Sequence, residues 1–379
     1  MIYIIIIIIL LLFTIQYDVN NKKVSNTLIF LWWLIFVLLA GLRFRVGGDT
    51  NAYMLYYNQT LKIADLNYHE FIKDSYQPFW VILCSLSKTV SSDFTFFQFV
   101  HAIITNSIIF YFIRKNSNYF FTGILFYFIF YYLYFNTEIL RETLAICVFI
   151  LSLRYYLLKK WTIYYIFCFI AFLFHISAIV LFFLPLFSSI WTKRSYFIFF
   201  VVILVLLILL SKFNIYEKIF DLIPNEDIRS KAKIQTVAPG AKANIFGVIY
   251  TSVVNIIIPF TLIYVSEQFV GYKSEFRSLL YAYILISLIA IFLSPTYRFL
   301  NYLNPIYYLF LANMLHELFR YPRVRRFRYT IVLFIFLLPF SVHLMTLFRN
   351  TSDNGPVRRF YSRWYPYHSV FTKGNVSER

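Results

Sequence analysis

Residues 28–53 read LIFLWWLIFVLLAGLRFRVGGDTNAY, and this stretch decides the fold expected for the chain. Its first part, Leu28 to Leu42, is an apolar run long enough to form most of a membrane-crossing helix. Arg43, Arg45, two adjacent glycines and Asp49 then follow within a few residues. The planar guanidinium suits phosphate or carboxylate oxygens, and adjacent glycines let backbone N–H groups approach a ligand. The stretch therefore predicts a helix that ends in a candidate anion site, although interface anchoring by arginine beside a glycine turn is an ordinary alternative.

Apolar runs of this kind recur along all 379 residues, of which 60% are hydrophobic and only 14% are charged. Soluble domains do not have such a composition. A β-barrel would alternate apolar and polar residues, whereas runs such as Ile4 to Leu12 and Phe197 to Leu210 are continuously apolar. We therefore expect an all-α polytopic membrane protein with about 12 transmembrane helices.

The net charge of +18 is distributed in short basic clusters between the apolar runs. This placement is typical of topology signals and lipid headgroup contacts, so we expect a lipid bilayer and not a nucleic acid as the partner. The clusters that we assign to the cytoplasmic side lie at residues 22–23, 114–115, 159–160, 193–194 and 320–328.

The domain organisation follows from this topology. Residues 1–348 are predicted to form a single transmembrane domain with external loops at 43–93 and 211–244, and 349–379 to form a C-terminal tail. Within the first loop, Tyr76 to Val90 begins with Gln-Pro and is short for a crossing. We expect it to lie as a helix along the outer surface, before a crossing at about 94–113.

The three cysteines, Cys84, Cys147 and Cys168, lie in or beside apolar segments and form no CxxC pair. Neither a disulfide framework nor a metal site is indicated by their spacing. We therefore expect no metal and no cofactor.

Several ionisable residues from separate stretches fall on the same, outer face of the predicted topology. They are Arg43, Arg45, Asp49, Glu138, Arg141, Glu142, His175 and Arg298. Such residues at helix ends or within spans are costly and often functional. An arginine-lined pocket would suit the diphosphate of a lipid-linked sugar.

Each of these residues also has an ordinary structural explanation. Arg43 and Arg298 could anchor the chain at the membrane interface, and Asp49 could cap a helix that starts at Thr50. Glu138 and Arg141 could form a local i,i+3 ion pair. His175 could be a polar side chain whose hydrogen bonds are satisfied between helices. The other histidines have no charged company in the sequence and are interpreted as structural: His69, His101, His316, His343 and His368.

The run Arg45-Val46-Gly47-Gly48-Asp49 with Tyr53 resembles the Arg…Gly-(Thr/Ser)-Asp…Tyr signature of the EpsG family, which are Wzy-like polymerases of O-antigen, capsule and exopolysaccharide repeat units. Further matching motifs follow in order: Arg141 with Ala145, Phe174-His175-Ile176-Ser177-Ala178, and Tyr297-Arg298. Gly48 stands where the family has Thr or Ser, and Gln77 where it has Glu. The resemblance covers roughly residues 1–345.

The resemblance implies a polysaccharide polymerase that joins undecaprenyl-diphosphate-linked oligosaccharide repeat units. Such enzymes lie in the bacterial inner membrane as multi-pass proteins with the active site facing the periplasm or outside. Their architecture resembles that of the C-type glycosyltransferases (GT-C-like), whose first external loop carries an acidic residue followed by a surface helix. A chain-length regulator is a candidate partner.

Roles for individual residues follow as hypotheses from this implied reaction. The candidates for binding the leaving diphosphate are Arg45, Arg141 and Arg298, with Arg43 next. The candidates for the base that activates the acceptor hydroxyl are Asp49, His175 and Glu138. Tyr53 is a candidate for stacking on a sugar.

Three other functions compete with polymerisation. Another lipid-linked-sugar glycosyltransferase or ligase would use a similar pocket with a different acceptor. A lipid-linked oligosaccharide flippase would show internal repeats and broken helices, and no repeat is evident in the sequence. A membrane O-acyltransferase would need a deep histidine, for which His175 is the candidate.

Overall fold

The computed structural model describes residues 2–68, 76–189, 200–205, 245–293, 296–320 and 363–375. In these residues the chain forms helices and loops without a β-strand, apart from one isolated antiparallel bridge between Arg43 and Ser369. The expected all-helical fold is therefore confirmed for the described part. The chain divides into two compact units: Met1–Ile179, Leu311–His316 and Arg326–Arg379 form the first, and Val180–Phe310 and Glu317–Arg325 form the second.

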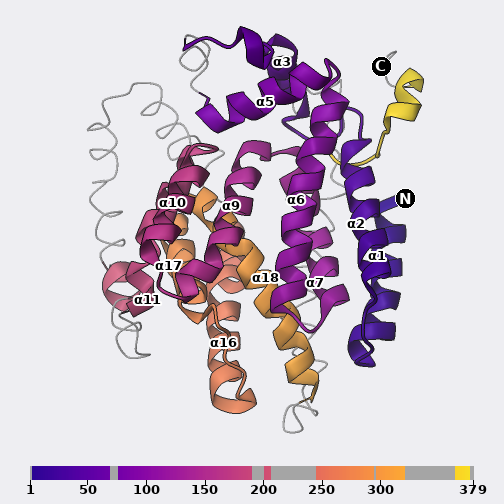
Figure 1. Ribbon diagram of the computed structural model, residues 1–379. Coiled ribbons are helices and arrows are strands. Elements are labelled where there is room, and N and C mark those ends of the chain that lie inside the picture. The colour runs from indigo at the N-terminus through magenta and orange to yellow at the C-terminus, as the bar shows by residue number, and fades with distance from the viewer. Residues whose placement is uncertain are drawn as a thin grey trace. The chain divides into compact units, whose positions relative to one another are not determined.

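The first unit contains most of the helices among the described residues (Figure 1). They are α1 (Ile2–Phe13, continued by a π-helical segment, Thr14–Val19), α2 (Asn26–Gly41), α3 (Thr50–Gln59), α5 (Pro78–Val90), α6 (Phe94–Asn116), α7 (Phe120–Tyr127), α8 (Leu133–Thr137), α9 (Leu140–Leu157) and α10 (Trp161–Phe172). A π-helical segment, Phe128–Tyr132, joins α7 to α8. In this unit α6 packs against α2 and α9, and α9 packs against α10.

The second unit contains α11 (Leu186–Ser189), α15 (Ile245–Ser252), α16 (Ile258–Val265), α17 (Arg277–Phe292) and most of α18 (Tyr297–Arg320). A π-helical segment, Val253–Ile257, joins α15 to α16, and another, Ser266–Val270, follows α16 up to Gly271. α17 packs against α11, α15 and α16.

Four described helices are long and apolar enough to cross a membrane: Ile2–Val19, Phe94–Asn116, Phe120–Thr137 and Gly247–Val270. Shorter apolar helices include α2, α5, α10 and α17. These segments fit the expected membrane protein, while the total of about 12 spans and the inside–outside orientation stay predictions. The predicted external loop at 211–244 lies outside the described residues. The apolar runs at about 196–210 and 330–348 are also expected to cross the membrane, and the second and most of the first lie outside the described residues as well.

The apolar run at about 176–190 is also expected to cross the membrane, but its described residues, 176–189, form a different structure. Ile176–Phe183 is a 3₁₀ helix, and only the short α11 follows it. Pro185 explains the interruption, because proline has no N–H to donate and disfavours the α conformation of the residue before it.

Local sequence signals set the ends of the helices in the first unit. Ser25 caps α2 by accepting a hydrogen bond from the backbone N–H of Leu28 at 3.2 Å. Asp93 caps α6 in the same way through the N–H of Thr95 at 2.8 Å. Pro78 occupies the first turn of α5, where its missing N–H costs nothing.

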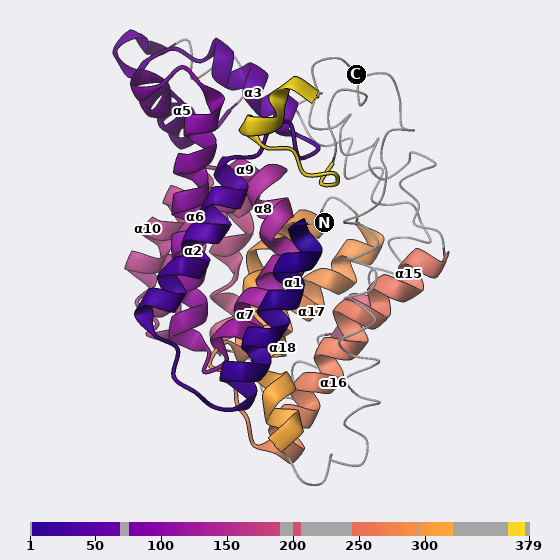
Figure 2. The same ribbon diagram turned by 90° about the vertical axis from the view of Figure 1, so that its right-hand side faces the viewer.

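Two contacts define the two ends of the first unit. Arg114 at the end of α6 donates to Asn26 at the start of α2, at 2.8 Å. Near the other end of α6, the ring of His101 lies 3.1 Å from the carbonyl oxygen of Leu140 at the start of α9. The chain between α2 and α6 therefore gathers at one end, which we call the loop end (Figure 2).

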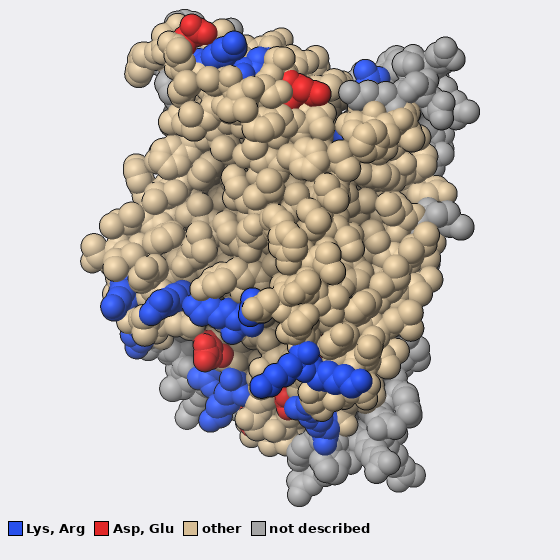
Figure 3. All heavy atoms as spheres, turned by 45° about the vertical axis from the view of Figure 1, so that its right-hand side comes forward, with Lys and Arg blue, Asp and Glu red and all other residues tan. Residues whose placement is uncertain are grey.

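The opposite end of the first unit, the basic end, carries the lysines and arginines that the sequence assigned to the cytoplasm. They are Lys22, Lys23, Arg114, Lys115, Lys159 and Lys160. Over the helices of this unit, Figure 3 shows a broad band of uncharged side chains between the two charged ends. This distribution is what a bilayer around the helices requires.

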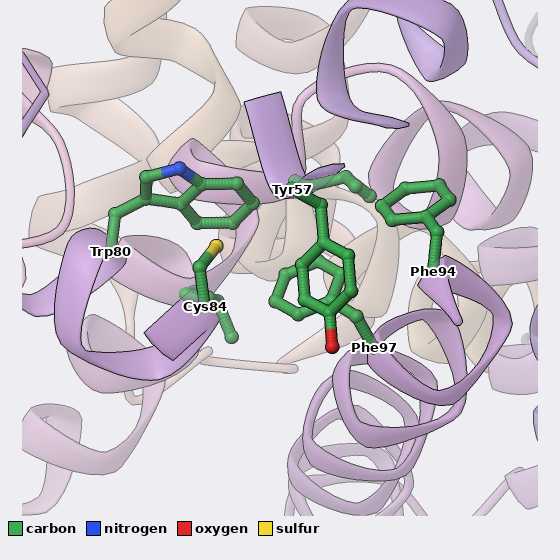
Figure 4. Close-up of a cluster of buried hydrophobic side chains, with 7 residues drawn as sticks. Tyr57, Trp80, Cys84, Phe94 and Phe97 are labelled. Atoms are coloured by element: carbon green, nitrogen blue, oxygen red, sulfur yellow. The ribbon is translucent and has the colours of Figure 1, made fainter. Parts of the chain in front are cut away.

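A buried cluster fixes α3 and α5 to the bundle at the loop end (Figure 4). The rings of Trp80 and Phe97 meet edge to face with centroids 5.2 Å apart, and Tyr57 lies 5.5 Å from Phe97. The hydroxyl of Tyr57 donates to the carbonyl oxygen of Ser91 at 2.7 Å. The helix predicted within 76–90 is thus present as Pro78–Val90, and it packs apolar side chains on the ends of α6 and α9.

A buried polar network at the basic end joins α7 to the segments that flank it. Asp18 accepts hydrogen bonds from the backbone N–H and the hydroxyl of Thr122, at 2.6 and 2.8 Å. The same hydroxyl lies 2.7 Å from Nε2 of His316, whose ring stacks on Tyr119. The sequence places no charged residue near His316, whereas in the structure Asp18, from near the N-terminus, shares the Thr122 hydroxyl with it.

We expect Thr122→Val to destabilise the protein by about 1–2 kcal/mol, because Asp18 and His316 each lose a buried partner. Thermal unfolding of the detergent-purified protein measures the effect. Thr14→Val is the matched control, because the Thr14 hydroxyl is buried without a hydrogen-bond partner and its loss costs little. Equal melting temperatures for both variants would contradict a structural role for this network.

Candidate functional site

The loop between α2 and α3 lies directly on the end of α8. Arg45 has φ of 51° and Gly47 has φ of 114°, so the chain turns sharply through left-handed conformations. A Cβ placed on Gly47 would lie 2.5 Å from Cβ of Thr137. The hydroxyl of Thr50 closes the turn by donating to the carbonyl oxygen of Val46 at 2.7 Å. Glycine at 47 is therefore required by both its conformation and its surroundings.

Glu138 joins this loop to two other parts of the first unit. Its Oε1 accepts from the backbone N–H of Gly48 at 3.4 Å and from Nε of Arg363 at 2.9 Å. Its Oε2 accepts from Nη2 of Arg363 at 3.3 Å, and its carbonyl oxygen accepts from the hydroxyl of Tyr53 at 3.1 Å. The local ion pair with Arg141, one alternative from the sequence, is thus replaced by a pair with Arg363.

Arg141 lies in the first turn of α9, close to Tyr53 of α3. Its Nη1 donates to Oε1 of Gln77 at 3.3 Å, and its guanidinium lies 4.4 Å from the ring centroid of Tyr76. Its Nε is buried without a hydrogen-bond partner. Burial raises the pKa of Tyr53 to about 12, with the charge of Arg141 opposing the shift, so Tyr53 stays a hydroxyl donor.

Arg43 and Arg45 also keep donors without partners. Arg43 is only 2% exposed, and Nη1 donates to the carbonyl oxygen of Ala40 while Nε and Nη2 have no partner. Burial lowers its pKa to about 10, which leaves it cationic at neutral pH. Nε of Arg45 is buried and unpartnered, and its guanidinium lies 5.3 Å from the ring centroid of Phe44. Interface anchoring does not describe Arg43, because its side chain does not reach solvent.

Asp49 lies at the start of α3, as the sequence predicts, but its side chain makes no capping hydrogen bond. Its side chain is exposed at the loop end, and its charge acts on the hydroxyl of Tyr53. The alternative role as a helix cap is therefore not what the structure shows.

His175 follows α10 at the same end, where the N–H of Phe79 donates to the carbonyl oxygen of Leu173 at 3.0 Å. The ring is 7% exposed, and its Nδ1 accepts from the backbone N–H of Ser177 at 3.2 Å. The hydroxyl of Ser177 lies 2.6 Å from the same nitrogen. A neutral ring that accepts at Nδ1 carries its proton on Nε2, which makes His175 a donor.

Arg298 lies in the first turn of α18, in the second unit, and its side chain is exposed. The other candidates lie at the loop end of the first unit: Arg43, Arg45, Asp49, Glu138, Arg141 and His175. Within the described residues, no group of three or more His, Cys, Asp and Glu side chains is arranged to hold a metal ion.

Arg363 also lies at this end, and no sequence pattern indicates it as a site residue. Trp364 follows it, an aromatic residue for which the sequence leaves open stacking on a sugar or packing. Nε1 of Trp364 donates to Oγ1 of Thr137 at 3.1 Å, and its carbonyl oxygen accepts from the hydroxyl of Tyr3 at 2.9 Å. Trp364 is buried, so it anchors the chain and does not present a face to a sugar. The aromatic run Trp364-Tyr365-Pro366-Tyr367 in an otherwise polar tail is the signal that could have indicated a packed segment.

The chain matches the model of a known protein family. The model of the EpsG family matches residues 26–369, which includes the loop after α2, the start of α9, His175, Arg298 and Arg363. No curated protein and no solved structure gives a significant match.

Proposed function

Because the chain belongs to the EpsG family, we propose that it is a membrane polysaccharide polymerase that joins undecaprenyl-diphosphate-linked oligosaccharide repeat units. In the proposed reaction, the bond between the anomeric carbon of the growing glycan and its diphosphate breaks. A hydroxyl of a second lipid-linked unit forms the new glycosidic bond and releases its proton to a base. Undecaprenyl diphosphate leaves, and the loop end faces the periplasm or outside of the bacterial inner membrane.

The observation that carries this proposal is the set of guanidinium donors without partners at the loop end. Arg45 and Arg141 each keep a buried Nε that donates to no atom of the protein. Such donors, held in place before the reaction, stabilise the charge that develops on a leaving diphosphate. Arg43 is sealed beneath the surface, so it contributes through its charge.

The roles of the remaining candidates follow from their hydrogen bonds. Asp49 is the preferred base, because its carboxylate is exposed and does not cap α3. Nδ1 of His175 already accepts from the N–H of Ser177, so we propose that His175 contributes to phosphate binding and not as the base. Arg298 remains a proposed diphosphate ligand on the strength of the family motif, and Tyr53 a proposed sugar contact whose hydroxyl is engaged by Glu138.

The test uses the full chain, purified and reconstituted in vesicles, with the lipid-linked oligosaccharide of its own host. We expect a ladder of products that lengthens with time and requires no nucleotide sugar. A single transfer to another acceptor would identify a ligase, and movement of the substrate across the vesicle membrane without a new bond would identify a flippase. Either result would overturn the proposed polymerase.

A further inference from the structure

The described C-terminal residues form a segment that is bound to the loop end, and we call residues 363–372 the strap. Its backbone pairs with the start of the loop after α2: the N–H of Phe44 donates to the carbonyl oxygen of His368, and the N–H of Val370 to that of Leu42, both at 2.9 Å. The hydroxyl of Tyr367 donates to the carbonyl oxygen of Leu39 at 3.1 Å. The strap is therefore held by main-chain contacts as well as by the buried Trp364.

Arg363 is the member of the strap that reaches the candidate site. Its guanidinium grips the Glu138 carboxylate with two nitrogens, at 2.9 and 3.3 Å, while stacking over Trp364 at 4.3 Å. The side chain of Glu138 is only 10% exposed, so a charged partner matters to it. The same Oε1 that binds Arg363 also accepts from the N–H of Gly48.

These contacts connect the strap to the residues of the proposed chemistry. Gly48 lies between Arg45 and Asp49, and Glu138 lies three residues before Arg141. A shift of the Glu138 carboxylate therefore moves the loop that carries a proposed diphosphate ligand and the proposed base.

We propose that Arg363 is a positioning residue of the transfer site, which acts by fixing Glu138 and through it the loop at 43–49. This inference rests on the proposed polymerase function. The inference gives Glu138 a structural role. Its carboxylate accepts from Arg363 and Gly48, so it holds the loop in place and does not act as the base. The inference also makes the strap part of the structure that borders the site and fixes its geometry.

Activity of Arg363 variants tests the inference. Arg363→Gln is expected to lower kcat by about tenfold or more with a smaller change in KM, because the misplaced loop weakens contacts made in the transition state. Arg363→Lys keeps the charge but cannot form the bidentate hydrogen bond with the carboxylate, so we expect intermediate activity. Arg277→Gln is the matched control, because it breaks another arginine–glutamate pair, at 3.2 Å, in the second unit, and it should leave kcat unchanged.

A double-mutant cycle separates positioning from an independent effect. If Arg363 acts through Glu138, Arg363→Gln combined with Glu138→Gln should be no slower than Glu138→Gln alone. Losses that multiply in the double variant would overturn the inference. Wild-type kcat in Arg363→Gln would do the same.

A cross-link tests the strap without relying on activity. Leu42 and Val370 are neighbours across the strap contact, because the N–H of Val370 donates to the carbonyl oxygen of Leu42 next to the antiparallel bridge between Arg43 and Ser369. The native cysteines are buried and do not compete for the new disulfide. The full chain with Leu42→Cys and Val370→Cys should cross-link under mild oxidation, and the cross-linked protein should keep its activity. Failure to cross-link, or an inactivation that reductant reverses, would show that the strap is not a fixed border of the site. Cross-linking in a protein that forms no polymer would overturn the proposed function alone.

Discussion

Arg141→Ala should abolish polymer formation and leave single lipid-linked repeat units intact. The guanidinium of Arg141 donates to Gln77 and stacks over the ring of Tyr76, while its Nε has no partner in the protein. Removing a donor that is aimed at developing negative charge costs on the order of 10² to 10³ in kcat. Arg141→Lys should recover little activity, because an ammonium cannot stack on Tyr76 and reach a phosphate oxygen in the same geometry.

The measurement is the distribution of product lengths in the vesicle assay, with KM recorded for each variant. Arg45→Ala and Arg298→Ala belong to the same series, because they are the other proposed diphosphate ligands. Arg114→Ala is the control, since it removes an arginine at the basic end whose partner is Asn26. Wild-type chain lengths in Arg141→Ala, Arg45→Ala and Arg298→Ala together would contradict the proposed diphosphate site.

The helices at the loop end follow closely from short-range sequence signals. Asp93 and the following apolar run predict α6, and Gln77-Pro78 predicts the start of α5, because capping and proline geometry act within a few residues. The positive φ of Gly47 confirms the glycine turn after α2 that the sequence offers as one alternative, whereas the anion site stays a prediction. What the pattern at Gly48 could not show is that its N–H points at a carboxylate of the protein itself.

The partner of Glu138 could not be predicted from sequence spacing. Helical spacing predicts a pair with Arg141, three residues away, whereas the pair forms with Arg363, which is 225 residues away. Glu138 precedes α9 and is not part of its helical surface, so the spacing rule does not apply to it. Only the packing of the strap, through Trp364 and the bridge at Ser369, brings Arg363 within reach.

Gly47→Ala should abolish the proposed polymer formation, whereas Gly48→Ala should reduce it less. At Gly47 the added Cβ meets Cβ of Thr137 at 2.5 Å and the Thr50 hydroxyl at 2.6 Å, in a backbone with φ of 114°. The strain costs about 1–3 kcal/mol, and the clash forces the loop off the end of α8. Because Arg45 and Asp49 lie on this loop, a displacement of about 1 Å can cost on the order of 10² in rate.

At Gly48 the added Cβ lies 3.3 Å from Oε1 of Glu138, the far end of a side chain, and the backbone is not left-handed. We therefore expect a smaller loss at Gly48 than at Gly47, because the Glu138 carboxylate, which Arg363 holds, has to give way only slightly. The family that the chain resembles has Thr or Ser at this position. Product lengths and thermal unfolding are measured for both variants.

Gly271→Ala separates the two causes of damage at Gly47. Gly271 also has a positive φ, of 76°, but no atom lies within 4 Å of its added Cβ. This variant carries backbone strain without a clash, far along the sequence from the loop after α2. If strain alone mattered, Gly271→Ala would lose as much stability as Gly47→Ala. A loss of kcat in Gly47→Ala but not in Gly271→Ala would show instead that the close contact of the loop with Thr137 positions the candidate site.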